Sequence, residues 1–213
     1  EIPGEGTNRV NAAYAFGGPD LLVRTVTGAT GIPVHHYLEV EFGGFADIVD
    51  ALGGIELAFE HPARDLKSGL EVGAGTQVVD GATALAYARS RQYEENRGGE
   101  WVSVGSGDIA RTARQREVLL KIVEKAGSPA TILRSPGVLA AVTGSLTSDS
   151  ELSQWTLVRT AWVMRAAEVS DAVALPVVGS NEGGVSYVVA REPEASEVLE
   201  AFRAGRPLPG DQG

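Results

Sequence analysis

Residues 80–127, DGATALAYARSRQYEENRGGEWVSVGSGDIARTARQREVLLKIVEKAG, carry the clearest secondary-structure signals of the chain. Asp80 stands at a helix N-cap position before the alanine-rich run 81–88. Asp108 takes the same position before a longer helix that Gly127 ends. Residues 94–107 between these helices are rich in glycine and follow no sustained period, which predicts a flexible loop or an insertion.

Outward from this stretch, predicted helices and strands alternate. Toward the N-terminus the patterns predict a helix that ends at Gly31, a strand over 34–42, a short helix over 43–54, a strand over 55–59 and a loop or hairpin over 62–79. Toward the C-terminus they predict helices over 129–143 and 151–168, strands over 172–178 and 184–190, and a helix over 193–204. The alternation predicts a single α/β or α+β domain with a central sheet and helices on its faces.

The composition excludes several classes of function. With 43% apolar and 22% charged residues the chain is globular, and its formal charge of -10 argues against nucleic-acid binding, which needs clustered cations. The absence of cysteine excludes disulfides, thiolate zinc sites and cysteine nucleophiles. No window is long and apolar enough for a membrane span, and the first residues do not have the pattern of a signal peptide. The chain starts as if inside a loop, so we expect an upstream part.

Six arginines between Arg89 and Arg116 stand out in this acidic chain. On the helix that starts at Asp108, residues three and four apart share one face. That face is polar in its first half and apolar in its second half, as expected for a site that binds an amphiphile with an anionic head at the helix start. The stripe comprises Arg111, Arg114, Gln115, Val118 and Ile122.

Arg89 and Arg91 are two residues apart, which places them on one face, with Tyr87, only if the segment is extended. Four guanidinium groups from two elements could then hold a pyrophosphate through bidentate hydrogen bonds. The alternative is a set of solvated or salt-bridged arginines. Their available partners are Glu94, Glu95, Glu100 and Glu117. The pattern alone leaves both interpretations open.

Three blocks resemble the LytR-CpsA-Psr family of bacterial cell-wall enzymes, in order and from about Thr7 to Thr147. They are NRVNAAYAFGGPDLLVRTVTGATGIPVHHYLEVEFGGFADIVDALGGIEL at 8–57, DGATALAYARSR at 80–91 and GDIARTARQRE at 107–117. The resemblance implies a three-layer α-β-α domain over residues 1–205, with a central mixed sheet flanked by helices, without the family's N-terminal strands. Residues 206–213 are then a flexible tail.

The resemblance also implies a function. Such enzymes are membrane-anchored phosphotransferases at the extracytoplasmic face of the bacterial membrane. They move a glycopolymer from a polyprenyl-pyrophosphate carrier onto peptidoglycan, at the 6-hydroxyl of muramic acid. Teichoic acid, capsular polysaccharide and arabinogalactan are all handled within the family. The abundance of Ala, Gly, Val and Arg suggests a GC-rich genome and hence an actinobacterial arabinogalactan.

Residue by residue, the resemblance places the family's paired arginines on Arg89 and Arg91 and its D-x-x-R-x-x-R-Q block on residues 108–115. Asp108, Arg111, Arg114 and Gln115 would act at the carrier's phosphates, with Arg9 a weaker phosphate ligand. Val118 and Ile122 would contact the lipid. The family's Mg²⁺-binding aspartates and its membrane anchor are expected upstream, so the chain itself offers no metal ligands.

Two questions remain open in the sequence. Asp108 could assist removal of the acceptor proton, or it could cap its helix and orient Arg111. Without the metal-binding region, the chain could also be a non-catalytic module that binds polyprenyl phosphate or glycan, or a polyprenyl pyrophosphatase with water as the acceptor.

Overall fold

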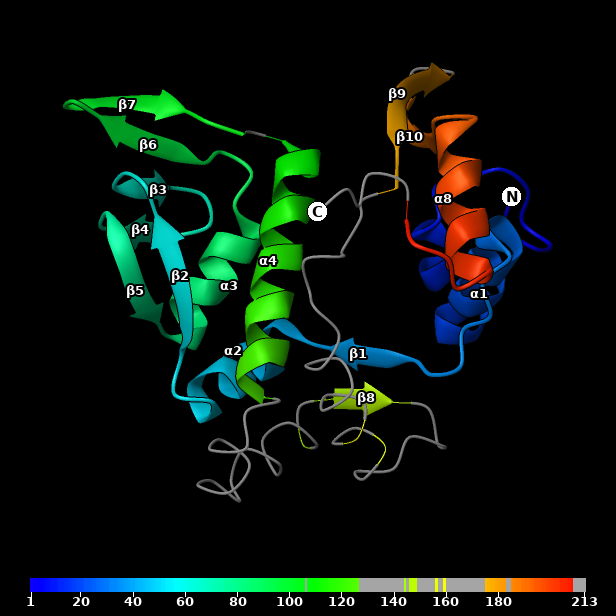
Figure 1. Cartoon of the computed structure of the whole chain (residues 1–213), viewed down its shortest axis with the longest axis horizontal. Coiled ribbons are helices and arrows are strands. Elements are labelled where there is room, and N and C mark those ends of the chain that lie inside the picture. The colour runs from blue at the N-terminus through cyan, green and yellow to red at the C-terminus, as the bar shows by residue number, and fades with distance from the viewer. Residues whose placement is uncertain are drawn as a thin grey trace. The chain divides into compact units, whose positions relative to one another are not determined.

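The computed structural model describes residues 1–105, 107–126, 144, 146–148, 156, 159, 175–182 and 185–208. The chain forms two compact units. One comprises Glu1–Tyr37 with Ser170–Gly213, and the other comprises Leu38–Val169. Their helices and strands are labelled in Figure 1.

The first unit contains α1 (Ala12–Thr30), β9 (Val177–Glu182), β10 (Val185–Ala190) and α8 (Glu194–Arg203). The predicted end of α1 is confirmed: Gly31 adopts a left-handed conformation, and its N–H donates to the carbonyl of Thr27. Within α1, the backbone is non-helical at Gly17 and Gly18, directly before Pro19. Because proline cannot continue a helical hydrogen-bond ladder, α1 is two helical segments joined by a kink.

The C-terminal strands and helix of this unit agree with the sequence in order and type. β9 and β10 pair antiparallel, but residues 179–182, which fall between the two predicted strands, belong to β9, where they pair with residues 185–188 of β10. Ladder pairing therefore overrides the weak strand propensity of these polar residues. α8 buries Ala195, Val198 and Ala201 on one face, as an amphipathic helix does.

The second unit contains the remaining elements, and its strands pair antiparallel within three separate sheets. Its helices are α2 (Phe42–Ala51), α3 (Gly81–Arg89) and α4 (Asp108–Ala126). Its strands are β1 (Leu38–Val40), β2 (Ile55–Phe59), β3 (Ala63–Asp65), β4 (Leu70–Val72), β5 (Gly75–Val79), β6 (Glu94–Arg97), β7 (Glu100–Ser103) and β8 (Leu146–Ser148). β1 pairs with β8, β2 with β5, and the four-stranded sheet has the order β4-β3-β6-β7.

The prediction of a flexible loop was wrong for residues 94–103, which form the β6–β7 hairpin, whereas the alternative of an insertion stays a prediction. Arg97 pairs with Glu100, so only Gly98 and Gly99 form the turn, and both have positive φ. This is the backbone requirement of a type I′ hairpin turn, which glycine meets without strain. The N–H of Gly99 also donates to Oδ1 of Asn96 at 2.8 Å.

The core of the second unit lies between its sheets and the helices α2, α3 and α4. Figure 1 shows α4 running beside α3. The buried cluster includes Ile55, Leu57, Tyr87, Tyr93 and Val118. Asp80 caps α3 as predicted, since its side chain accepts from the N–H of Thr83 at 2.8 Å.

The α/β class predicted from the sequence is confirmed. Every strand pair in the described part of the chain is antiparallel, whereas a mixed sheet was expected. The helices predicted at 129–143 and 151–168 fall on residues that are outside the described ranges, apart from 156 and 159. Of the predicted tail, 206–208 lie outside helix and strand, and 209–213 are not described. Within the described ranges, no helix combines the length and the hydropathy that a membrane span requires.

Candidate phosphate-binding site

The segment that follows α3 carries Arg89 and Arg91, and its conformation differs from the prediction. Tyr87 and Arg89 lie in the last turn of α3 rather than in an extended segment, and Ser90 ends the helix. The alanine-rich run continues the helix through Arg89, because alanine has the highest helix propensity. The arginines are therefore separated by the helix end. The Arg89 guanidinium lies over the Phe42 ring, 4.8 Å from its centroid.

Arg91 and Arg111 meet at a single carboxylate oxygen. Nη2 of Arg91 lies 2.9 Å from Oδ1 of Asp108, and Nη2 of Arg111 lies 3.1 Å from the same atom. The side chains of Arg91 and Asp108 are 56% and 65% exposed, and that of Arg111 is 29% exposed. Two of the four guanidinium groups thus lie at one carboxylate, each in an ion pair with it, and their role at a phosphate stays a prediction. Two guanidinium groups around one carboxylate leave a net positive charge that an exposed anion can reach.

Arg111 has unused hydrogen-bonding capacity. Its Nε is buried and has no hydrogen-bond partner among the described residues. A buried N–H without an acceptor costs about 1–3 kcal/mol, more for a charged group. A phosphate oxygen is an acceptor of the right charge, and arginine binds it in a bidentate manner.

Asp108 is the first helical residue of α4, and its exposed carboxylate binds the two arginines. Asp108 thus lies within ion-pair distance of Arg111, and both of its predicted roles stay predictions. Arg97, by contrast, pairs with Glu95 at 2.9 Å, so for this arginine the salt-bridge alternative is confirmed.

Arg114 occupies a different environment from Arg91 and Arg111. It is 7% exposed, and its guanidinium donates to the carbonyls of Ser90 at 2.6 Å and Gly105 at 3.2 Å. It also lies 5.1 Å from the centroid of the Tyr93 ring. Burial lowers the pKa of Arg114. In this structure the Arg114 guanidinium therefore bonds to the backbone at Ser90 and Gly105. The sequence had instead predicted that it presents its donors to an exposed anion.

The rest of the predicted stripe separates into exposed and buried parts. Gln115 is exposed next to Arg111 and Arg114, where it remains available to a ligand. Val118 is 0% exposed in the core cluster, and Ile122 packs against the same cluster. The prediction that Val118 contacts a lipid is wrong for this structure, because the apolar half of the stripe is the packing face of α4.

A separate pocket of about 420 Å³ runs along a neighbouring face of α4. It is lined by Tyr87, Ala110, Ala113, Arg114, Arg116, Glu117 and Leu120. The Tyr87 hydroxyl donates to Oε2 of Glu117 at 2.8 Å. Burial, followed by this hydrogen bond, raises the pKa of Tyr87, so the phenol stays protonated. This pocket combines apolar side chains with guanidinium groups.

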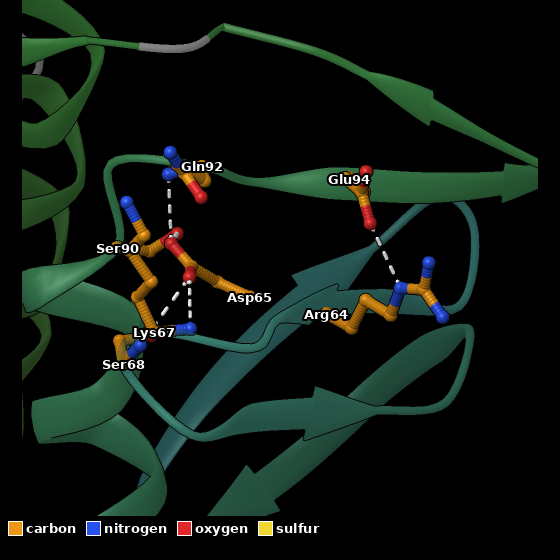
Figure 2. Close-up of polar contacts among 7 residues, drawn as sticks. All are labelled: Arg64, Asp65, Lys67, Ser68, Ser90, Gln92 and Glu94. Atoms are coloured by element: carbon orange, nitrogen blue, oxygen red, sulfur yellow. Dashed lines mark hydrogen bonds and ion pairs between the residues drawn. The ribbon is translucent and has the colours of Figure 1, made fainter.

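Asp65 is a residue of this region that the sequence analysis missed. It is 1% exposed at the end of β3, and its carboxylate accepts hydrogen bonds from both sides, as Figure 2 shows. Burial alone would raise its pKa, but hydrogen bonds from Ser90, Gln92, Lys67 and Ser68 outweigh burial and lower the pKa to about 2. The sequence DLKSG at 65–69 signals a local Asp turn. Nothing in it signals contacts with residues some 25 positions later.

Arg9 lies in the first unit, where its guanidinium is 5.9 Å from the centroid of the Tyr187 ring. Its role at a phosphate stays a prediction. Across the described ranges, no group of three or more His, Asp or Glu side chains is placed to hold a metal ion. These residues therefore do not offer the expected Mg²⁺ a site of that kind.

The order of these residues along the chain matches a known family. A model of the LytR_cpsA_psr family matches residues 1–204. The chain belongs to the LytR-CpsA-Psr family. The probable cell wall biosynthesis protein LcpB of Corynebacterium glutamicum is 35% identical over 201 residues, which cover 93% of this chain and 45% of LcpB.

Two further members support the assignment. TagU of Enterococcus faecalis, a polyisoprenyl-teichoic acid–peptidoglycan teichoic acid transferase, is 29% identical over 204 residues, which cover 95% of this chain and 63% of TagU. The solved structure of a LytR-Csp2A-Psr enzyme from Actinomyces oris superposes with a TM-score of 0.74 at 27% identity, over 95% of this chain and 75% of that one. The chain thus spans about half to two thirds of the length of these curated relatives.

Proposed function

We propose that this LytR-CpsA-Psr chain is a phosphotransferase that moves a glycopolymer from a polyprenyl-pyrophosphate carrier onto the 6-hydroxyl of muramic acid in peptidoglycan. The observation that carries the proposal is the convergence of Arg91 and Arg111 on Asp108, with both arginine side chains partly exposed. A pyrophosphate bears the charge and the acceptor oxygens that these donors require. TagU, a polyisoprenyl-teichoic acid–peptidoglycan teichoic acid transferase, supports the proposed transfer of a glycopolymer to peptidoglycan.

In the proposed step, the acceptor hydroxyl attacks the phosphorus nearer the glycan. A new O–P bond forms, the bond to the bridging oxygen breaks, and polyprenyl phosphate leaves with that oxygen. Arg91 and Arg111 donate to the phosphoryl oxygens, on which charge builds. The hydroxyl proton passes to a base, for which Asp108 is the nearest carboxylate to both arginines. Arg89 would bind the second phosphate, and Gln115 would donate an amide N–H.

The pocket along α4 would receive the first part of the polyprenyl chain. Ala110, Ala113 and Leu120 supply apolar surface, while Arg114 and Arg116 line the same pocket. The carrier's lipid is thus proposed to lie on this face of α4 instead of along Val118 and Ile122. Mg²⁺ is proposed as the cofactor of the complete enzyme and would neutralise pyrophosphate charge; the steps above involve only residues of this chain.

The cellular setting follows from the substrates. Polyprenyl carriers and peptidoglycan meet at the extracytoplasmic face of the bacterial membrane, so we place the protein there, attached by a membrane anchor outside this chain. Arabinogalactan is the proposed polymer on composition alone, and teichoic acid is the polymer named for TagU.

The test of the site is lipid occupancy. The chain, Arg91→Ala, Arg111→Ala and the control Arg97→Ala are expressed in bacteria, and co-purified polyprenyl phosphates are counted by native mass spectrometry. Arg97 is the matched control because it is an exposed arginine already paired with Glu95. We expect loss of lipid from the first two variants only. Equal occupancy in all four proteins would overturn the proposed site.

The test of the reaction uses a synthetic polyprenyl-pyrophosphate disaccharide with Mg²⁺ and peptidoglycan fragments. Transfer of the sugar phosphate to the fragment supports the transferase. Release to water alone would identify a polyprenyl pyrophosphatase, and retention of the intact donor would identify a binding module.

A further inference from the structure

We infer that Asp65 and Arg114 are positioning residues, which hold the Ser90–Arg91 peptide from opposite sides and thereby set the Arg91 guanidinium against Arg111. The inference rests on the proposed function, since Arg91 and Arg111 are its phosphate ligands. Both side chains are buried: Asp65 is 1% exposed, and Arg114 is 7% exposed although it also lines the pocket along α4. Their contribution would be geometric.

Asp65 holds the first side of the peptide. Its Oδ2 accepts from the Ser90 hydroxyl at 2.6 Å, from the Arg91 N–H at 2.9 Å and from the Gln92 N–H at 2.8 Å. Its Oδ1 accepts from the N–H groups of Lys67 at 2.9 Å and Ser68 at 3.2 Å. Figure 2 shows the carboxylate between these two turns. One buried carboxylate thus fixes the turn after α3 to the turn after β3.

Arg114 holds the second side. Its Nη2 donates to the Ser90 carbonyl at 2.6 Å, and its Nη1 donates to the Gly105 carbonyl at 3.2 Å. The N–H of Gly107 donates to the Arg91 carbonyl at 3.0 Å. Arg114 lies one turn after Arg111 on α4, so the bond to Ser90 ties the backbone before Arg91 to the helix that carries Arg111.

This network adds side-chain bonds to the end of α3, where Ser90 is the C-cap and its N–H donates to the Tyr87 carbonyl. Ser90 is 0% exposed, and its hydroxyl, its carbonyl and the next N–H are all bonded to Asp65 or Arg114. The hydrogen bonds at Ser90 and at the Arg91 N–H are all made in a buried setting, where they are stronger than in water. Nε of Arg114 itself has no partner among the described residues. Arg91 and Arg111 come from separate elements, and a displacement of about 1 Å between groups that act together costs on the order of 10²-fold in rate.

The experiment is a double-mutant cycle on ligand affinity. Farnesyl pyrophosphate is titrated by calorimetry into the chain, Asp65→Asn, Arg91→Ala and the double variant, below the unfolding temperature of the least stable protein. Asn keeps the shape of Asp65, but its amide N–H₂ faces N–H donors. Glu94→Gln is the matched control, because it breaks the Arg64–Glu94 ion pair at 2.8 Å in the same sheet and leaves the Ser90 turn alone.

We expect Asp65→Asn to weaken binding by about tenfold, Glu94→Gln to leave it unchanged, and Asp65→Asn to have no further effect once Arg91 is alanine. Coupled residues give such non-additive changes, whereas a merely structural effect of Asp65 would add to that of Arg91→Ala. Suppose that Arg91→Ala binds weakly. The positioning role is then overturned if the effects of the two substitutions add, or if Asp65→Asn binds with wild-type affinity. If Arg91→Ala itself binds normally, the proposed phosphate site fails, and the positioning role with it.

A conservative replacement of Arg114 by lysine gives a second test of the network. Arg114→Lys keeps a cation but has one nitrogen in place of the fork that reaches both Ser90 and Gly105. We expect the affinity for farnesyl pyrophosphate to fall about tenfold in Arg114→Lys. In Asp65→Asn we expect faster hydrogen exchange at the amides of Arg91 and Gln92, which donate to Asp65 in the wild type. Unchanged exchange and unchanged affinity would contradict the network.

Discussion

Replacement of Asp108 by asparagine separates the two roles that the carboxylate could have. In the structure Oδ1 of Asp108 forms ion pairs with Nη2 of Arg91 at 2.9 Å and with Nη2 of Arg111 at 3.1 Å, so it lies where a phosphate oxygen would bind. Asp108→Asn keeps the volume and one acceptor oxygen but removes the charge. We expect the variant to bind pyrophosphate more tightly than the wild type does.

The magnitude follows from the exposure of the groups. Arg91 and Asp108 are more than half exposed, and pairs of this kind are worth about 0.2–1 kcal/mol each. Release of two pairs therefore gives about 1 kcal/mol, which corresponds to about fivefold in the dissociation constant. Salt screens exposed charges, so the gain should shrink at about 1 M ionic strength, where the Debye length is about 3 Å.

The assay is calorimetric titration with inorganic pyrophosphate at low and high salt. Glu124→Gln is the control: it also removes one carboxylate from α4, that of the Lys121–Glu124 pair at 3.2 Å. We expect no change in that variant. If Asp108→Asn weakens pyrophosphate binding as strongly as Arg91→Ala does, Asp108 organises the arginines rather than competing for them, and the reasoning is refuted.

The same variant tests catalysis. If Asp108 takes the acceptor proton, transfer should fall by about 10²–10⁴-fold although pyrophosphate binds more tightly. If it only occupies the arginines between turnovers, transfer should stay within a few-fold of wild type. A rate loss without tighter binding would agree with neither role.

Three stability predictions follow from the fold. The pKa of Asp65 is lowered to about 2 in the folded chain, so its ionised form stabilises the fold by about 2 kcal/mol above pH 4. The difference in unfolding free energy between wild type and Asp65→Asn should therefore narrow as the pH falls from about 4 to about 2. A difference that stays constant over this range would contradict the prediction. Val118→Ala should cost about 2 kcal/mol in urea unfolding, and the exposed control Leu119→Ala less than about 0.5 kcal/mol; equal losses would argue against Val118 as a core residue. At Gly81 an added Cβ would clash with the Ala46 carbonyl oxygen, so Gly81→Ala should lower the thermal midpoint of unfolding. Gly43 lies in α2 with open space around it, so Gly43→Ala should raise the midpoint. A rise in both variants would show that α2 and α3 separate freely.

Local signals in the sequence sufficed for most elements of the fold. The Gly31 stop, the Asp80 cap and the alternation of residues 55–59 act within a few residues, and each was confirmed. The Gly98–Gly99 turn was also visible in the sequence but was interpreted as loop, because its flanking residues EENR and EWVS are polar and do not alternate. Pairing of these two segments across the hairpin, rather than their composition, makes them strands.

The arginines show which properties the sequence alone predicts and which depend on tertiary structure. The sequence by itself determined which arginines share a helix, and the resemblance pointed to a phosphate site, because both depend on spacing along the chain. Only the tertiary structure decided that Arg91 and Arg111 meet at Asp108, that Arg114 is used to hold the Ser90 backbone, and that Val118 faces the core. Which donors stay available to a ligand depends on which acceptors lie within about 3 Å, and those acceptors come from segments far apart in the chain.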